Sequence, residues 1–341
     1  MTIGITYDLR DEYLLRGLGE DDAAEFDTSE TIDAIETGLT SLGHQTDRIG
    51  CIRNLTARLA AGHRWDIVFN IAEGLNGLSR ESQVPALLDA YAIAYTFSDP
   101  TVLGVTLHKA LAKRVVRDIG IDTPDFVVFD TDADLENFRL SFPVFAKPVA
   151  SGSSLGISRA SKIFNADELL CVCRGLRARF RQPVLVETFL SGREFTVGIV
   201  GTGRSTRVLG ALEILLQQAA EPDIYSYANK RDYQRLVRYR LAEDAVALQV
   251  SELALRVWTG LGCRDAGRVD IRLDECGKPN FLEVNPLAGL HPEHSDLMIT
   301  CRLLEISFME LLNSILESAQ ERRSGQRTME KRPLVPTLRC A

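Results

Sequence analysis

Short apolar runs alternate with segments of helical spacing in the N-terminal third of the chain. The runs have the length of buried strands, and the spaced segments have the three- and four-residue period of amphipathic helices. Strands and helices that alternate in this way predict a parallel sheet covered by helices. The predicted strands are TIGITYD, WDIVFNIA and AYTFS, and the predicted helices are Ser29–Leu42, with Ser29 as its N-cap, QVPALLDAYAI and Lys109–Ile119.

The pattern changes after Thr123-Pro124, where a proline breaks the chain and strands predominate. The predicted strands are FVVF, PVFAKPV, GISRAS, PVLVETFL, EFTVGIVG and RVLGALEIL. The last third adds a helix at Glu243–Leu261, the strand pair AGRVDIRLD and PNFLEVNP, and an amphipathic helix from Leu303 to about Leu316. After Glu321 the sequence is polar and basic without an apolar period, which indicates a mobile end. The predicted fold class is therefore α/β, with parts of α+β character.

Composition and charge narrow the class of protein. A chain of 341 residues has room for two or three domains, and a net charge of −8 argues against a nucleic-acid-binding surface. No run approaches ~18 apolar residues, and the start has no basic leader, so neither a membrane span nor a signal peptide is expected. The seven cysteines are scattered, and the spacing of Cys171 and Cys173 is not CxxC. These features indicate a cytoplasmic protein with reduced thiols.

A loop of small residues follows an apolar strand in VFAKPVASGSSLGIS, residues 144–158. Gly152, Ser153, Ser154 and Gly156 leave backbone N–H groups open to an anion, which predicts a phosphate-binding loop. Lys147 precedes the glycines on the strand side, so this segment is not GxxxxGK[ST]. The first predicted strand is followed by LRDEYLLRG rather than GxGxxG, which disfavours a nicotinamide-binding domain.

Charged residues share strand faces in the predicted hairpin GRVDIRLDECGKPNFLEVN. Arg268, Asp270 and Arg272 lie on one face of the first strand, and Glu283 and Asn285 lie on one face of the second. A turn centred on residues 276 and 277 places Asp270 opposite Glu283. Two carboxylates and an amide oxygen suit Mg²⁺, which takes further ligands from a nucleotide. The alternative is that these charges are solvated or paired with arginine, but unmatched acids among apolar strand residues are costly, which favours the metal.

Four segments together resemble the ATP-grasp superfamily, and specifically the D-alanine–D-alanine ligase family. They are VFAKPVASGSSLGIS, VLVETFLSGREFTVGIVG, GRVDIRLD and FLEVNPLAGL, and the resemblance extends from about residue 66 to residue 316. It implies a three-domain ATP-grasp architecture with ATP between the last two domains. The implied parts are an N-terminal α/β domain (1–104), a central ATP-grasp subdomain (105–188), a C-terminal subdomain with metal and oxyanion residues (189–320) and the tail (321–341).

By this resemblance, the nucleotide is clamped between two sheets. Lys147 would reach the α- and β-phosphates, and the flexible loop with Ser153 and Ser154 would cover the γ-phosphate. The other implied nucleotide contacts are Lys109, Glu187 at the adenine end, the backbone near Phe189 and Leu190 at the base edge, Glu194 at the ribose hydroxyls and Lys230 in a lid. Taken alone, Lys109 also reads as a solvated helix lysine, and Glu194 as a surface pair with Arg193.

The same resemblance implies an ATP-dependent carboxylate–amine ligase that forms a dipeptide through an acyl phosphate. Asp270, Glu283 and Asn285 would hold Mg²⁺, or Mn²⁺ in its place, and Arg268 and the Gly289 N–H would receive the oxyanion. D-Alanine is the named substrate, which implies a role in peptidoglycan biosynthesis. The implied partners are small amino acids, with no nucleic acid or membrane, and the family's habit implies a homodimer.

Two alternatives remain open. The first is a ligase of the same mechanism that joins other amino acids or small acids. The second is a nucleotide-binding protein that has lost catalysis, which the intact Arg268, Asp270, Glu283 and Asn285 argue against.

Departures from the family pattern bear on the amino-acid pocket. Arg231 stands where a tyrosine commonly follows the lid lysine; its charge either favours an acidic or larger substrate or pairs with Glu73. Glu73, in AEGLNGLSRES, replaces the histidine of HGxxGEDG, and the acidic pair of that motif is gone. Glu25, in AAEFDTSE, is the candidate that holds the ammonium group of the first substrate, and Ser153 is offered by the small-residue loop beside Arg231.

Two further segments flank this pocket. HPEHSDL, with His294, Ser295 and Asp296, replaces the family's serine–leucine near the second substrate's carboxylate, and His291 and His294 are expected in structural or substrate-contact roles rather than as metal ligands. The polar segment Gln217–Arg240 is too long for an ordinary turn and is predicted to be a lid that excludes water.

Overall fold

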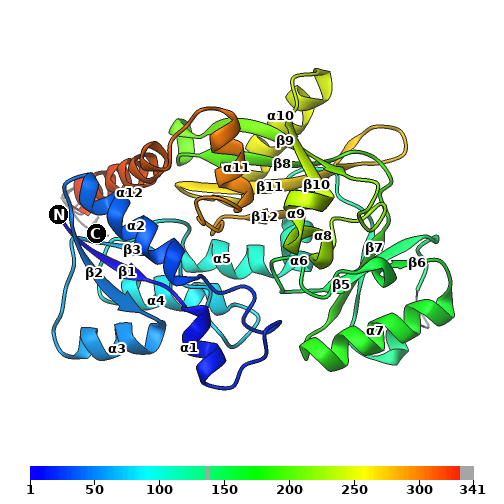
Figure 1. Cartoon of the computed structure of the whole chain (residues 1–341), viewed down its shortest axis with the longest axis horizontal. Coiled ribbons are helices and arrows are strands. Elements are labelled where there is room, and N and C mark those ends of the chain that lie inside the picture. Colours follow the sequence, from blue (N-terminus) through cyan, green and yellow to red (C-terminus); the bar gives the residue numbers. More distant parts are fainter. Residues whose placement is uncertain (136–137, 331–341) are drawn as a thin grey trace, which may run out of the picture.

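The computed structural model describes residues 1–135 and 138–330, which form three β-sheets with covering helices (Figure 1). The N-terminal sheet is parallel, in the order β2-β1-β3, which confirms the predicted parallel sheet. Its strands are β1 (Thr2–Thr6), β2 (Gln45–Gly50) and β3 (Ile67–Asn70). The helices of this part are α1 (Arg10–Leu15), α2 (Ser29–Ser41), α3 (Ile52–Ala60), α4 (Gln83–Ala90) and α5 (Pro100–Leu107).

Both faces of the N-terminal sheet are buried. On one face, Ile3 and Phe69 pack against α2 and against α12 (Phe308–Glu330), the last described helix. On the other face, Val68 packs with Leu55 of α3 and Leu88 of α4. Burial on both faces is usual for a parallel sheet, but here one cover comes from the opposite end of the chain.

Three N-terminal details differ from the prediction. AYTFS makes only an isolated bridge between Tyr95 and Val68, so the strand predicted there is wrong. The pattern did not predict β2, because only its last two residues are buried and its apolar signal is weak. Helix α2 begins at Ser29, but Thr28 is its N-cap.

The central sheet is antiparallel, in the order β4-β7-β5-β6. Its strands are β4 (Phe126–Phe129), β5 (Val144–Pro148), β6 (Lys162–Ile163) and β7 (Val184–Thr188). Helix α7 (Ala166–Phe180) covers one face, and α6 (Lys109–Asp118) precedes β4. The strand predicted at GISRAS is wrong, because residues 156–158 are not in a strand and Arg159–Ser161 form a short 3-10 helix. Gly156 lies at φ +78°, where a Cβ would stand 2.7 Å from Pro148.

The C-terminal sheet is antiparallel, in the order β10-β9-β8-β11-β12. Its strands are β8 (Glu194–Val200), β9 (Arg207–Leu216), β10 (Val237–Leu241), β11 (Ala266–Leu273) and β12 (Pro279–Asn285). Helix α10 (Ala245–Leu261) covers one face, and α11 (Asp296–Leu303) covers the other. Gly267 of β11 lets Trp258 of α10 approach closely, because a Cβ there would lie 2.7 Å from the indole ring.

The C-terminal helices are longer and differently divided than predicted. The helix predicted from Leu303 is wrong at its start, because α11 ends at Leu303 and α12 begins at Phe308. Glu305, at φ +58°, turns the chain between them. The predicted mobile end from residue 321 is helical up to Glu330, and residues 331–341 lie outside the described residues. Within the described ranges, no helix combines the length and apolar character needed to cross a bilayer.

The segment predicted to be a lid, Gln217–Arg240, is not a plain loop. It contains two short helices, α8 (Tyr227–Arg231) and α9 (Tyr233–Leu236), and most of β10. The buried Asn229 holds it together, because its side chain donates to the carbonyls of Glu221 (2.9 Å) and Ile224 (2.8 Å). A folded segment therefore lies over the C-terminal sheet.

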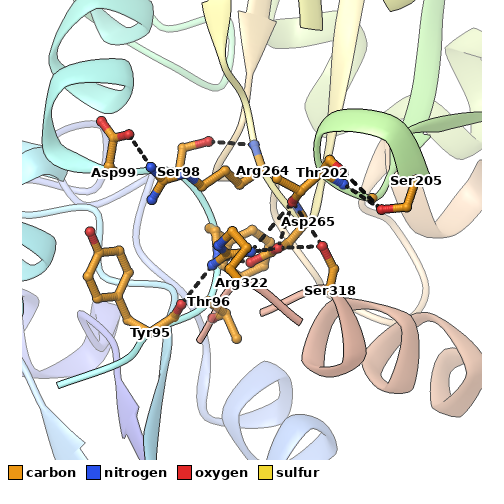
Figure 2. A network of polar contacts seen from close by, with 12 residues as sticks. Tyr95, Thr96, Ser98, Asp99, Thr202, Ser205, Arg264, Asp265, Ser318 and Arg322 are labelled. Atoms are coloured by element: carbon orange, nitrogen blue, oxygen red, sulfur yellow. Dashed lines mark hydrogen bonds and ion pairs between the residues drawn. The ribbon is translucent and has the colours of Figure 1, made fainter. Parts of the chain in front are cut away.

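A buried polar network joins the N-terminal part, the C-terminal sheet and α12 (Figure 2). Asp265, which is fully buried, pairs with Arg322 and accepts hydrogen bonds from Ser318 Oγ (2.7 Å), Thr202 Oγ1 (3.1 Å) and the Phe97 N–H (2.7 Å). Arg322 also donates to the Tyr95 carbonyl at 3.0 Å. We call this set the Asp265 network, and it fastens three distant parts of the chain together.

Candidate active site

Two adjoining cavities lie where the three sheets meet. The inter-sheet cleft lies between the central and C-terminal sheets, and the N-terminal cavity, of about 640 Å³, lies between the C-terminal sheet and the N-terminal part. Of the predicted site residues, the cleft is lined by Lys147, Ser154, Glu187, Phe189, Leu190, Glu194 and Asp270, the cavity by Glu25, Lys109, Ser153, Asn285 and Gly289, and both by Lys230, Arg268 and Glu283. The fold thus brings all of these residues to one region.

A buried cluster of two lysines and one glutamate closes the inner end of the cleft. Glu187 contacts both Lys147 Nζ and Lys113 Nζ at 2.8 Å. Burial alone would raise the pKa of Glu187, but the two lysines outweigh it and lower that pKa. The fully buried Lys113 also donates to Thr123 Oγ1 (2.8 Å), and burial lowers its pKa to about 8.

Sequence reasoning missed Lys113. The available signal was its place four residues after Lys109 on α6, which puts both lysines on one helix face. The structure shows that Lys113 supports Glu187 from behind, so the cleft-facing Lys147 is held by an already paired carboxylate.

Lys109 reaches into the site and is not a solvated helix lysine. It is buried, its Nζ lies 3.2 Å from Glu283 Oε2, and it donates to the Ser151 carbonyl at 2.6 Å. Burial would raise the pKa of Glu283, but Lys109, Lys147 and Arg268 outweigh it and lower that pKa. Glu283 therefore stays ionised in the absence of a ligand.

The predicted hairpin has the predicted register. Asp270 pairs with Glu283 across β11 and β12, and Arg268 pairs with Asn285. Thr196 Oγ1 donates to Asp270 at 2.6 Å, and Arg268 forms an ion pair with the same carboxylate. Burial raises the pKa of Asp270, and Glu283 adds to this effect, while Arg268 opposes it.

These donors fit a hard divalent cation. Asp270, Glu283 and Asn285 offer two carboxylates and an amide on neighbouring strands. The described residues contain no group of three or more His, Cys, Asp or Glu side chains placed to hold a metal. Mg²⁺ bound by these three side chains would take its remaining ligands from a nucleotide and water.

Aromatic and cationic groups surround the outer end of the cleft. Phe189 lies under Lys162 Nζ, 4.2 Å from the ring centroid, and under Arg272, 5.2 Å from the centroid. Glu194 pairs with Arg272 at 3.0 Å. The alternative of a surface pair between Glu194 and Arg193 is wrong, because Arg193 binds Glu213 and Asp244 instead.

Asp296 lies between two cations, Lys230 and Arg268, at the boundary of the two cavities. Its buried carboxylate lies 3.2 Å from Lys230 Nζ and 3.8 Å from Arg268 Nε. Burial would raise the pKa of Asp296, but Lys230 and Arg268 lower it. Gly289 lies close by, and a Cβ on it would stand 3.1 Å from Ser295 Oγ.

Sequence reasoning missed two residues at the N-terminal cavity: Glu81, which lines it, and Arg80, which pairs with the lining Glu25. The buried Arg80 binds Glu25 at 2.5 Å and the Ala150 carbonyl at 2.8 Å, and the Gly152 N–H donates to the other oxygen of Glu25. Glu81 lies within hydrogen-bond reach of Glu73, so an acidic pair exists although the family's own pair is gone. Both missed residues belong to the SRES segment, whose charges were the available signal.

Arg231, His291 and His294 flank the N-terminal cavity. Arg231 is exposed at the mouth of the cavity, and no ion pair joins it to Glu73 among the described residues. His291 and His294 stack with ring centroids 3.5 Å apart, and His291 Nε2 lies 3.3 Å from Glu30.

Comparison with known proteins agrees with this geometry. Residues 115–317 match the family model described as the C-terminus of D-ala D-ala ligase. The chain is 32% identical over 271 residues to the D-alanine--D-alanine ligase of Bordetella petrii, covering 78% of this chain and 79% of that protein.

Solved structures share the fold. The D-alanine--D-alanine ligase of Bacillus anthracis complexed with ATP has a TM-score of 0.72 at 19% identity and covers 96% of this chain and 99% of that one. The VanG D-Ala:D-Ser ligase of Enterococcus faecalis has a TM-score of 0.70 at 20% identity, covering 93% and 99%. The chain thus belongs to the D-alanine–D-alanine ligase family and has the ATP-grasp fold.

Proposed function

We propose that this protein is an ATP-dependent ligase that joins the carboxylate of one amino acid to the amine of another, with D-alanine as the substrate that the names of its relatives support. One observation carries the proposal. Lys230, Arg268 and Glu283 line both the inter-sheet cleft and the N-terminal cavity, so a phosphoryl group in the cleft meets a substrate in the cavity. We assign residues 1–104, 105–188 and 189–320 as its three domains.

The cleft is suited to a nucleotide. Lys147 and Lys109 each rest on a carboxylate, Glu187 and Glu283 respectively, and nucleotide phosphates would supply further negative charge to both lysines. The loop with Ser153 and Ser154 lies at positive φ, which turns its backbone toward the cavities. At the other end, the backbone of Phe189 and Leu190 would meet the base edge, and Glu194 the ribose hydroxyls.

Asp270, Glu283 and Asn285 would hold Mg²⁺ or Mn²⁺. When bound, the cation would neutralise charge on the phosphates during transfer. The protein's own contribution is to hold the two carboxylates in register across β11 and β12 and to keep Glu283 ionised through Lys109.

The reaction follows from the charges of the site. The γ-phosphoryl group passes to the substrate carboxylate and forms an acyl phosphate, because a carboxylate is a poor electrophile until its oxygen becomes a leaving group. The amine of the second substrate then attacks the acyl carbon and phosphate leaves. Arg268 and the Gly289 N–H would stabilise the oxyanion between these steps, and loss of one such donor typically costs about 10²–10³ in rate.

Lys230 and its segment would protect the acyl phosphate from water. Lys230 rests on Asp296, and Tyr225 lies 3.4 Å from the same carboxylate. These contacts hold α8 against the site, which is the position that a closed lid takes over a reactive intermediate.

Phosphate release from ATP tests the proposal. We expect release to require both Mg²⁺ and an amino acid, with a dipeptide as co-product detected by mass spectrometry. Release that is independent of every amino acid tested, or an absence of release with ATP bound, would contradict the ligase assignment.

A second candidate is a ligase of the same mechanism with other amino-acid substrates. The observation that favours it is the acidic wall of the N-terminal cavity, where Glu73 and Glu81 have taken the place of the family's motif.

A further inference from the structure

The N-terminal cavity has an acidic wall whose charges are not balanced within the protein. The wall consists of Glu25, Glu73 and Glu81, which line the cavity, together with the buried Arg80 that pairs with Glu25, and we call it the Glu73–Glu81 wall. Arg80 is its one cation within the described ranges, and it lies within ion-pair distance of Glu25 only. Neither Glu73 nor Glu81 forms an ion pair with any described residue.

Four of the other cations that line the cavity are already paired, and the fifth, Arg231, is exposed. Lys109 binds Glu283, Lys230 binds Asp296, and Arg268 binds Asp270, all on the side of the C-terminal sheet. Arg10 forms its ion pair with Glu20. Lys109 also lowers the pKa of Glu81, but its ion pair is with Glu283, so no cation from the opposite side of the cavity forms an ion pair with the wall.

The pKa values of the acids in the wall are raised. Burial is the largest cause that raises the pKa of Glu73, and Glu81 and Glu25 raise it further. Burial also raises the pKa of Glu81, against the opposing effect of Arg80. Asp27 lines the same cavity without an ion pair, and burial together with Asp8 raises its pKa.

Three buried acids elsewhere in this protein have ion-pair partners. Glu187 has Lys113 and Lys147, Glu213 has Arg193 and Arg240, and Asp265 has Arg322. Because an unpaired buried carboxylate is costly, the protein satisfies those that serve its fold. Glu73 and Glu81 have no such partner, and they lie at the surface of a cavity, where a ligand can supply the missing cation.

A count of charges defines that ligand. With Glu25, Glu73 and Glu81 ionised and Asp27 left out of the count, three carboxylates and the Arg80 guanidinium leave two negative charges, which two ammonium groups would balance. An amino acid with a neutral side chain brings one ammonium, so one carboxyl of the wall would have to keep a proton. A diamino acid brings two ammonium groups and balances the wall completely.

We propose that the first, carboxylate-donating substrate is a diamino acid whose side-chain ammonium binds between Glu73 and Glu81. Its α-ammonium group lies at Glu25, and its carboxylate points to Arg268. This inference rests on the proposed ligase function and specifies its substrate class. The exposed Arg231 contributes little to the selection, because water screens its charge at the mouth.

The test compares isosteric donors on the unmodified protein. D-Ornithine is paired with D-norleucine, and D-2,4-diaminobutyrate with D-norvaline, together with their L enantiomers, each in the presence of D-alanine, ATP and Mg²⁺. We measure kcat/KM for phosphate release and identify the N-terminal residue of the product by mass spectrometry. The expected result is that each diamino acid exceeds its neutral isostere by ten-fold or more and supplies the N-terminal residue.

Two variants assign the preference to the wall. Glu73→Gln and Glu81→Gln are each expected to reduce the ornithine-to-norleucine ratio by ten-fold or more. Glu293→Gln is the matched control, because Glu293 is an exposed glutamate on the same cavity, and its ratio should stay that of the unmodified protein. Should the wall variants fail to fold, the isosteric comparison decides alone.

The outcomes separate the two levels of the account. Neutral amino acids that equal or exceed their diamino isosteres would overturn the inference and leave the ligase function standing. An absence of phosphate release with every amino acid would overturn the proposed function, and the inference with it.

Discussion

The Asp265 network and the Glu73–Glu81 wall both place carboxyl groups inside the protein beside the N-terminal sheet, yet they are satisfied differently. Asp265 has no exposed surface and is surrounded by Arg322, two hydroxyl groups and a backbone N–H (Figure 2). Glu81 interacts with Glu73 and with the charge of Arg80. The ion pair of Arg80 is with Glu25.

The difference separates carboxylates that hold the fold from carboxylates that await a ligand. A buried acid that joins distant segments must be paired at all times, because its desolvation cost is permanent. An acid at a cavity can remain partly protonated until a cation arrives. The following predictions test this division, from the largest expected effect to the smallest.

The first prediction concerns the carboxylates assigned to the metal. Asp270→Ala combined with Glu283→Ala is expected to abolish amino-acid-dependent phosphate release, because both charged donors of the cation are lost. Circular dichroism serves as the control for folding, and we expect the thermal unfolding midpoint to fall, because Lys109 and Arg268 lose the carboxylates with which they pair. Release that survives in a folded double variant would show that this pair does not hold the metal.

The second prediction concerns the network that holds the fold. Asp265→Ala removes the carboxylate that pairs with Arg322, and breaking such an ion pair costs on the order of 3–5 kcal/mol. Urea unfolding measures the loss, with Glu317→Ala as the control because Glu317 is exposed on the same helix, α12. A loss below about 1 kcal/mol would mean that the network does not fasten the three segments.

The third prediction concerns Lys230, which shares Asp296 with Arg268. Lys230→Ala is expected to lower kcat by about 10²–10³, the typical cost of removing one group that stabilises transition-state charge. ADP binding, measured by calorimetry, should remain nearly intact. Equal losses of turnover and ADP binding would indicate that Lys230 supports the fold of α8 instead.

Some of the site could be predicted because its spacing is local. The period of two along β11 and β12, together with a short turn, is enough to place Asp270 opposite Glu283. Lys147 and its loop likewise form one continuous segment. Such features need no knowledge of how distant parts of the chain meet.

Other features depend on tertiary contacts and leave little trace in the sequence. Arg80 meets Glu25 across 55 positions, and Arg322 meets Asp265 across 57. The same limit explains the tail, because the polar sequence after Glu321 has no apolar period, although Arg322 anchors that end of α12. The strand predicted at AYTFS failed for a related reason, since only Tyr95 bridges to β3 and the apolar side chains of the segment pack in the core.

The fourth prediction is a pH effect with a definite sign. Arg80, Glu25, Lys109 and Glu73 face Glu81, and burial raises its pKa from the ordinary 4.5 to about 7. A raised pKa gives stability that is present below the ordinary value and is lost as the pH rises through the raised one.

Glu81→Gln should therefore gain stability relative to the unmodified protein as the pH increases from 5 to 8, by urea unfolding at each pH. Glu293→Gln, the exposed control, should show no such trend. A constant difference across this range would mean that Glu81 is ionised throughout and that the wall is balanced within the protein.

The most direct test of the unbalanced wall is the number of protons released when a donor binds. Calorimetric titrations at pH 7, with ADP and Mg²⁺ present, are made in two buffers of different ionisation enthalpy. We predict that D-ornithine displaces a proton held by Glu73 and Glu81, that D-norleucine does not, and that Glu81→Gln removes the difference. Equal proton release by the two amino acids would contradict the account.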